Sequence, residues 1–247
     1  MTSGAVSARP RLSFVSESRR VLAQAAPLRQ QVVEVIRRDI IDADLPPGAR
    51  LLESAMCERY GVSRTVIREA LRQLEAERLV TVLPNRGPVV TVLTVPDVES
   101  LYDVRRALEG LAGELFAERA TAEEARALRD HIAAMEADYV HGDQAARGRA
   151  KDRFYELLVD GAHNEVLRED LHRVHSRIGI FRYYAFLDQT RVVASMAEVR
   201  AIAHAAAELR DPVAARKACE DHIARAGALA VVEYRAHHLS QAVPEAF

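Results

Sequence analysis

The chain has 247 residues, with 34 basic and 36 acidic side chains and a formal net charge of −2. A hydrophobic content of 49% beside 28% charged residues excludes wholesale disorder and indicates a globular protein. No apolar run approaches the roughly 18–20 residues that a membrane span requires, so we expect no membrane partner. The two cysteines, Cys57 and Cys219, cannot form a disulfide framework and suit a reducing compartment.

The net charge hides two regions of opposite sign. Residues 1–95 carry 14 arginines, no lysine and 10 acidic residues, a formal charge of +4, whereas residues 96–247 carry −6 and all nine histidines. The difference predicts two domains, residues 26–95 and 96–240, joined by the short stretch Thr94–Pro96. Residues 1–25 lack the apolar core of a signal peptide, which predicts a mobile arm and a cytoplasmic protein, and residues 241–247 are a predicted tail.

Hydrophobic periodicity in the first domain predicts three helices followed by a hairpin. Gly61 supplies a tight turn after the second helix, and Ser63 is a favoured N-cap for the third. This order of elements is the layout of a winged helix-turn-helix. The predicted elements are helices over Leu28–Ile41, Glu53–Tyr60 and from Ser63 onward, and strands Leu79–Leu83 and Val89–Leu93 around a turn at Pro84–Gly87.

The third predicted helix carries arginines on the face opposite to its apolar stripe. Arg64, Arg68 and Arg72 follow one another at four-residue spacing and therefore share one face. A helix in the major groove of DNA directs its N-terminal residues to the base edges, and Ser63, Arg64 and Thr65 lie at that end. Arginine pairs bidentately with guanine, while hydroxyls and the helix N-terminus hold phosphate.

Other arginines of this domain offer further contacts. Arg86 at the hairpin tip is placed to enter a minor groove or to grip the DNA backbone. Arg50 and Arg59 either contact phosphate or are solvated. A row of arginines on a helix is often no more than a solvated face. Here the short turn, the helix spacing and the wing together favour DNA contact. The predicted DNA-binding residues are Ser63, Arg64, Thr65, Arg68, Arg72, Arg86, Gly87 and Arg50.

The run from Pro46 to Val90 resembles the DNA-binding domain of GntR-family transcription regulators. It matches four features of the family: a proline-glycine pair that ends the first helix, a Gly-Val-Ser-Arg turn, an Arg-Glu-Ala-Leu helix and an Arg-Gly wing. Many relatives place a DNA-contacting arginine early in the second helix, where this chain has Ser54, so the operator sequence does not carry over. The matching segments are Pro47-Gly48, Gly61–Arg64, Arg68–Leu71 and Arg86-Gly87.

The second region shows long helical patterns and no convincing strand. Its helices predict an antiparallel bundle, in which ligands bind between inward-facing side chains. We expect one face of the first helix, formed by Val98, Leu101, Val104, Leu108, Leu111 and Leu115, to be buried. The predicted fold class is mainly α, a winged helix-turn-helix followed by an all-helical bundle. The expected helices are Asp97–Ala120, Ala122–Val140, Asp143–Val159, Glu165–Leu187, Val192–Glu208 and Pro212–His238.

This second region resembles the FCD effector domain of the FadR subfamily. Many FCD domains hold a divalent metal with one aspartate and three histidines, and the corresponding positions here are Lys151, Tyr155, Val199 and His222. An ammonium repels a cation, valine has no donor atom, and one imidazole cannot hold zinc. The resemblance therefore implies no metal and no cofactor at this site. The matching segments are Leu101–Arg105, Leu108-Glu109, Phe154 with His163–Leu167, and Asp211 with Ala214 and His222.

Two alternatives follow for the same positions. Lys151, Tyr155 and His222 can hydrogen-bond an acidic effector, with Arg105, which matches an inward-facing family arginine, supplying charge-assisted pairing. Alternatively, Lys151 extends to solvent and Tyr155 merely fills the core.

In a further alternative, other histidines of the second region form a metal site in place of the family's ligand positions. The protein is then a metal-dependent regulator. Its candidate ligands are His163, His172, His175 and His204, although surface or core histidines are more common than ligands.

The sequence therefore predicts a homodimeric, effector-responsive transcription repressor that binds an inverted repeat in double-stranded DNA. No nucleophile elbow, phosphate loop or paired catalytic motif is found, so we expect no enzyme activity.

Overall fold

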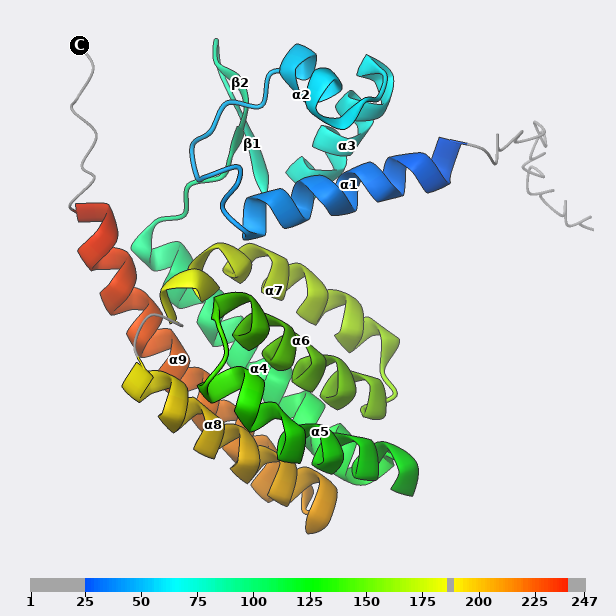
Figure 1. The fold of residues 1–247 in the computed structure, drawn as a ribbon, viewed down its shortest axis with the longest axis vertical. Helices are drawn as coiled ribbons and strands as arrows, with labels where there is room; N and C mark the ends of the chain where they lie inside the picture. Colours follow the sequence, from blue (N-terminus) through cyan, green and yellow to red (C-terminus); the bar gives the residue numbers. More distant parts are fainter. Residues whose placement is uncertain (1–24, 186–188, 240–247) are drawn as a thin grey trace, which may run out of the picture.

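The structure is a computed structural model that describes residues 25–185 and 189–239. Figure 1 shows a small domain with a hairpin at the top and a bundle of long helices below it. The predicted fold class is confirmed. Within the described ranges, no helix is both long and apolar enough to cross a membrane. The expected N-terminal arm, apart from Ala25, and the expected tail lie outside the described residues.

The upper domain contains α1 (Ala25–Ile41), α2 (Glu53–Tyr60), α3 (Arg64–Ala76), β1 (Val80–Leu83) and β2 (Gly87–Val90). Apolar side chains of these elements form one cluster, to which α1 contributes Ile36 and α3 contributes Ile67 and Leu74. Gly61 ends α2 in the left-handed conformation, with φ of 65°, which glycine adopts without strain. The Ser63 side chain then caps α3 by accepting from Val66 N at 3.4 Å, so the predicted turn and cap are confirmed.

The hairpin differs from the prediction in its second strand. β1 and β2 are antiparallel, with Val80 opposite Val90 and Leu83 opposite Gly87. The second strand therefore begins at Gly87 and ends at Val90, and the predicted strand Val89–Leu93 was placed too late. Gly87 has φ of 76° and turns the chain directly into the strand. Just beyond the two strands, Thr91 N donates to the Leu79 carbonyl at 3.0 Å.

The lower domain is a bundle in which α4 and α9 pack along each other (Figure 1). Their backbones approach closely because α4 carries Gly113, where a Cβ would lie 2.6 Å from Cys219 Sγ of α9. The predicted bounds of α5 are confirmed, but the helix expected over Val192–Glu208 begins earlier and ends in a π-helical turn, η1. The elements are α4 (Val95–Arg119), α5 (Ala122–Val140), α6 (Gln144–Gly161), α7 (Glu165–Ala185), α8 (Gln189–Ala203), η1 (His204–Glu208) and α9 (Pro212–Leu239).

The predicted face of α4 is largely buried, Leu101 and Leu115 included, but the buried surface also takes in two charged residues. Val104, expected inside, is 50% exposed, whereas Arg105 and Glu109 are buried. The two charged side chains lie one helical turn apart and pair with each other, which lets the helix turn them inward. Hydrophobic spacing alone could not show this, because it counts every charged residue as outward-facing.

The connection between the domains is packed against the bundle. The predicted joint Thr94–Pro96 is not a loop, because Thr94 caps α4 and Pro96 lies in its first turn. Leu93 belongs to an apolar cluster with Tyr102 of α4 and Tyr234 of α9. The Tyr234 hydroxyl donates to the Leu93 carbonyl, which ties the end of α9 to the chain entering the bundle.

Candidate functional site

The exposed face of α3 carries the residues predicted to contact DNA. Ser63, Arg64, Thr65, Arg68 and Arg72 are all exposed, because the opposite face of the helix is buried in the domain core. The N-terminal turn of α3, with its cap and two of these arginines, therefore faces solvent. This is the arrangement that a helix needs to enter a major groove.

Two arginines of this face are held by neighbouring carboxylates. Arg68 donates to Glu53 of α2 from Nε at 3.0 Å and from Nη2 at 3.1 Å. Arg72 donates from Nη1 to Glu69 at 2.8 Å. Sequence analysis did not identify Glu53 as a site residue, although it is the first residue of the helix that precedes the turn.

The hairpin supplies the remaining predicted contacts. Arg86 is exposed at its tip beside the half-buried Gly87, and Arg50 is exposed where it bridges to Val89 of β2. Arg59, for which phosphate contact and solvation were alternatives, pairs with Asp39 at 2.6 Å.

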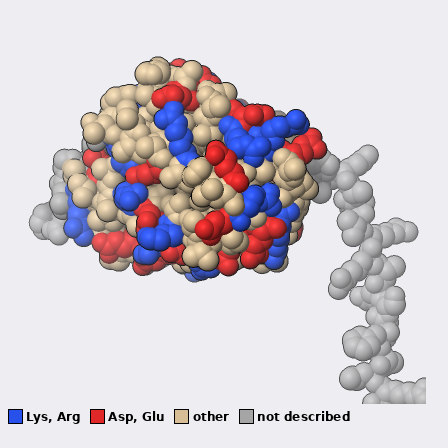
Figure 2. Space-filling model, turned by 90° about the horizontal axis from the view of Figure 1, so that it is seen from below, with Lys and Arg blue, Asp and Glu red and all other residues tan. Residues whose placement is uncertain are grey.

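The far end of the bundle has a different charge pattern. Figure 2 shows this end from below, with basic and acidic side chains intermixed and neither sign forming a continuous patch. Exposed charges of the bundle pair with each other, as Arg200 does with Glu136 and Lys217 with Asp221. Such a mixed surface creates no extended field of one sign.

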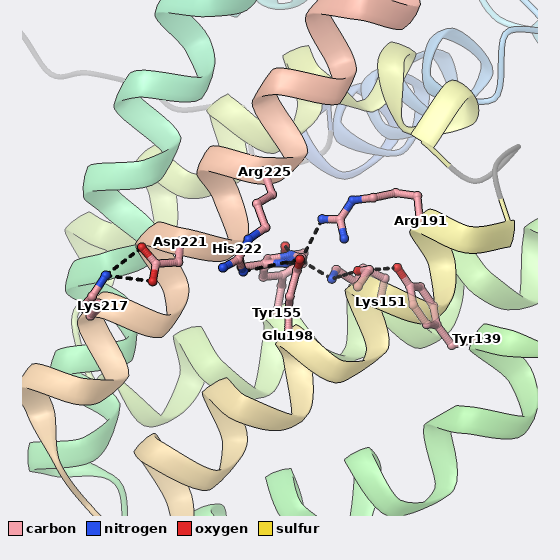
Figure 3. Close-up of polar contacts among 10 residues, drawn as sticks. Tyr139, Lys151, Tyr155, Arg191, Glu198, Lys217, Asp221, His222 and Arg225 are labelled. Carbon is pink, nitrogen blue, oxygen red and sulfur yellow. Dashed lines mark hydrogen bonds and ion pairs between the residues drawn. The ribbon is translucent and has the colours of Figure 1, made fainter.

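A second candidate site lies inside the bundle, where charged and polar side chains from several helices meet. Figure 3 shows the part around Lys151 and His222. The side chains of the site are almost completely buried: Arg105 is 7%, Glu109 1%, Lys151 6% and His222 2% exposed. A buried charge costs several kcal/mol unless it is paired and hydrogen-bonded, so its partners decide what the site can do.

The first part of this buried cluster is an ion pair within α4. Arg105 Nε donates to Glu109 Oε1 at 2.5 Å, and Arg105 Nη2 donates to the Tyr155 hydroxyl at 2.7 Å. His175 of α7 lies 2.8 Å from the same Glu109 oxygen. Burial alone would raise the pKa of Glu109, but Arg105 and His175 outweigh it and lower this pKa to about 2. Both members of the pair are therefore charged at neutral pH.

The second part is centred on His222 of α9. Its Nδ1 lies 2.6 Å from Glu198 Oε2, which also accepts from Arg191 at 2.8 Å. Burial and the nearby Lys151 lower the pKa of His222 to about 4, so the ring is neutral. With its proton on Nδ1 and donated to Glu198, the ring presents Nε2 as an acceptor toward the centre of the cluster.

Lys151 occupies that centre. Its Nζ donates to His222 Nε2 at 2.9 Å and to Ser195 Oγ at 3.2 Å. It also lies 5.4–5.7 Å from the ring centroids of Tyr139, Phe154 and Tyr155. No carboxylate pairs with it among the described residues. Burial and the charge of Arg105 lower the pKa of Lys151 well below its ordinary value.

The alternative in which Lys151 extends to solvent is wrong. The side chain points inward because the small Ser195 and the acceptor Nε2 of His222 give its amine two partners there. Tyr155 does not merely fill space either, since its hydroxyl accepts from Arg105 and lies 3.3 Å from His222 Nε2.

These side chains surround a cavity of about 50 Å³. Arginine, lysine and tyrosine predominate among its polar walls, so the cavity is lined mainly by hydrogen-bond donors. One side is apolar and is formed by α9. The lining residues are Tyr102, Arg105, Tyr139, Lys151, Tyr155, Arg191, Ser195, His222, Ala226 and Leu229.

The residues present do not fit a metal ion. His222 Nε2, the one imidazole nitrogen at the family's ligand positions, faces the Lys151 amine. Val199 is completely buried and has no donor atom. In the part of the chain that the structure describes, no group of three or more His, Cys, Asp and Glu residues could hold a metal.

The histidines considered for a rebuilt metal site do not come together. His163 pairs with Glu124, His204 with Glu208 and His175 with Glu109. His172 is exposed.

The structure thus brings together all four predicted effector residues, Arg105, Lys151, Tyr155 and His222. Sequence analysis missed their partners Arg191, Ser195 and Glu198, which all lie on α8. Their spacing of four and three residues, which places polar side chains on one face of a largely apolar helix, was the available signal.

Comparisons with known proteins cover both domains of the chain. The model of the gntR family of bacterial regulatory proteins matches residues 28–90, and that of the FCD domain matches residues 100–225. The chain is 32% identical to the HTH-type transcriptional regulator YdhC of Bacillus subtilis strain 168, over 73% of this chain and 81% of that protein. It is 25% identical to the HTH-type transcriptional repressor RspR of Escherichia coli K12, over 65% of this chain and 70% of that protein.

A solved structure supports the same fold. A GntR transcriptional regulator from Rhodococcus sp. RHA1 superposes with a TM-score of 0.71 at 25% identity, and the match covers 85% of this chain and 100% of that chain. These relatives are transcription regulators, not enzymes.

Proposed function

Because the chain belongs to the GntR family of bacterial transcription regulators and carries an FCD domain, we propose that it is a homodimeric repressor released from its operator by a small acidic effector. Its two-fold symmetry places two copies of α3 on successive major-groove faces of an inverted repeat in the cytoplasm. The name of the relative RspR supports repression rather than activation.

The exposed N-terminal turn of α3 supports the DNA-binding part of this proposal. Arg64 and Arg68 read base edges, while Ser63 and Thr65 hold phosphate at the start of the helix. Arg72 lies a turn further along and reaches the DNA backbone. Arg86 with Gly87, and Arg50, grip the backbone or the minor groove beside the hairpin.

One observation carries the effector part: among the described residues no carboxylate pairs with Lys151, which is buried in a cavity lined mainly by donors. A carboxylate of the effector supplies the missing negative charge, and Arg105 and Arg191 flank the same space. A cavity of about 50 Å³ holds little more than one or two waters, so the lining side chains move as the ligand enters.

The cavity has a direct route to the DNA-binding domain. Tyr102 lines it and also belongs to the apolar cluster that holds Leu93, where the chain enters the bundle. A ligand that moves Tyr102 or α9 therefore changes how the winged domain is held. A hundredfold loss of operator affinity requires about 2.7 kcal/mol of coupling, which lies within the usual range for allostery.

Fluorescence anisotropy tests the DNA part. We expect the protein to prefer an inverted repeat from its own promoter region over random duplex DNA, and equal affinities would contradict the proposal.

A thermal-shift screen of small carboxylates, sugar acids and acyl thioesters tests the effector part. The chain has only two lysines, which provide a matched control. We expect a stabilising carboxylate to lose its effect in Lys151→Met and to keep it in Lys217→Met, since Lys217 is 74% exposed. A ligand that acts equally on both variants binds elsewhere.

A further inference from the structure

Glu53 lies among the exposed arginines of α3. It is the first residue of α2, and its two carboxylate oxygens each accept from Arg68. The hydrogen bond from Arg68 lowers the pKa of Glu53, and the charges of Arg64 and Arg72 act in the same direction. A single negative charge therefore faces all three arginines of the surface predicted to bind DNA.

The geometry of the pair leaves one edge of the guanidinium available. Glu53 engages Nε and Nη2 of Arg68, which form one side of the planar group. The edge formed by Nη1 and Nη2 points away from the carboxylate. That edge carries two parallel N–H donors, the pattern that pairs with O6 and N7 of guanine.

The pair contributes little to holding the domain together. The side chains are 55% and 37% exposed, and ion pairs with such exposure add little to stability. The packing of α2 against the domain comes from buried apolar residues such as Met56. A carboxylate on a DNA-binding surface also repels phosphate, so its presence there weakens binding to DNA of any sequence.

From this geometry we propose that Glu53 is a positioning and specificity-determining residue: it holds Arg68 in the orientation that reads a guanine, and its charge disfavours DNA that lacks this guanine. The inference rests on the proposed function. The two-point contact restricts rotation of the guanidinium, so that the base contact forms with less loss of side-chain freedom. At a site without the guanine, Glu53 keeps Arg68 from turning to a phosphate instead.

Glu69 provides a matched control. It is also exposed, on the same surface, and pairs with Arg72 through one hydrogen bond rather than two. Glu69→Gln removes the same charge without releasing Arg68.

The experiment selects binding sites from a random duplex library with the wild type, Glu53→Gln and Glu69→Gln, and then measures affinity for the selected and random DNA. We expect Glu53→Gln to reduce the preference for guanine at one base pair of each half-site about tenfold. It should also bind random duplex several times more tightly. Glu69→Gln should leave the base preference unchanged, and all three proteins should unfold at the same temperature.

A second variant separates positioning from the effect of charge. Lysine cannot make the two-point contact, so Arg68→Lys should lose the guanine preference, and adding Glu53→Gln to it should reduce the preference no further. Identical base preferences in Glu53→Gln and the wild type would overturn the inference while leaving the proposed function intact. If the wild type itself selects no sequence, the proposed function fails.

Discussion

The two domains use arginine in opposite ways. In the winged domain, Arg64, Arg68 and Arg72 lie exposed along one face of α3, and Arg68 and Arg72 make ion pairs that solvent screens. In the helical domain, Arg105 is buried and enclosed by Glu109 and Tyr155. An exposed pair is screened by solvent and adds little to stability, whereas a buried pair is held in one geometry.

This difference suits two kinds of ligand. DNA is a large polyanion that displaces counterions from a surface, so exposed charges are sufficient to bind it. A small effector offers few contacts, and its recognition depends on donors that are already oriented in a water-poor site. Substitutions in each domain test the contrast between exposed and buried charges.

Replacing Arg64 and Arg68 together by alanine should weaken binding to the selected operator by about a hundredfold or more, because two base contacts are lost. The melting temperature and the oligomeric state should not change, since both side chains are exposed. Anisotropy, thermal melting and analytical ultracentrifugation measure these quantities. The control is Arg153→Ala, an exposed arginine of α6, which should bind DNA as the wild type does.

Glu109→Leu should destabilise the protein by about 3–5 kcal/mol, because it leaves Arg105 buried without its carboxylate. Chemical denaturation measures the free energy of unfolding. Glu156→Leu breaks an exposed pair with Arg153 and should change stability by less than about 1 kcal/mol. Equal losses in the two variants would mean that the buried pair contributes no more than the surface pair.

Acid should destabilise the protein, and His222 should dominate the effect near neutral pH. Its pKa is lowered from 6.5 to about 4, so between these values the unfolded chain takes up a proton that the folded chain does not. The free energy of unfolding should therefore decrease by up to about 3 kcal/mol as the pH falls from 6.5 to 4. Denaturation at a series of pH values measures this change.

Below this range the carboxylates continue the trend. Glu109 and Glu198 have pKa values of about 2 in the folded protein, below their ordinary value of 4.5, so their stabilisation is lost as the pH falls from 4.5 toward 2. His222→Gln should flatten the upper part of the profile. A wild-type profile that is flat from pH 6.5 to 4 would contradict the neutral state of His222.

Lys151→Met should stabilise the protein without ligand by about 2 kcal/mol, since it removes a buried amine with which no carboxylate of the described residues pairs. The gain is expected together with loss of the response to an acidic effector, so stability and function move in opposite directions. Denaturation of Lys151→Met and Lys217→Met measures the difference. A destabilised Lys151→Met would show that the amine is held favourably by Ser195 and His222.

Local sequence was sufficient to predict features that depend on a single helix or turn. The bounds of α2 and α5, the left-handed Gly61 and the Ser63 cap could be predicted, because each depends on residues within one or two turns. The exposed arginine face of α3 follows from the helical period in the same way. The identity of the four predicted effector residues, Lys151 among them, came from resemblance to a family rather than from spacing.

Contacts between residues far apart in the sequence determined where the buried charged side chains lie. The inward position of Arg105 depends on its pairing with Glu109 and on Tyr155, 50 residues away. The inward position of Lys151 depends on Ser195 and His222, on two other helices. A charged side chain is exposed by default and is buried only when its partners are supplied, so its place is known only once the helices that carry those partners are assembled.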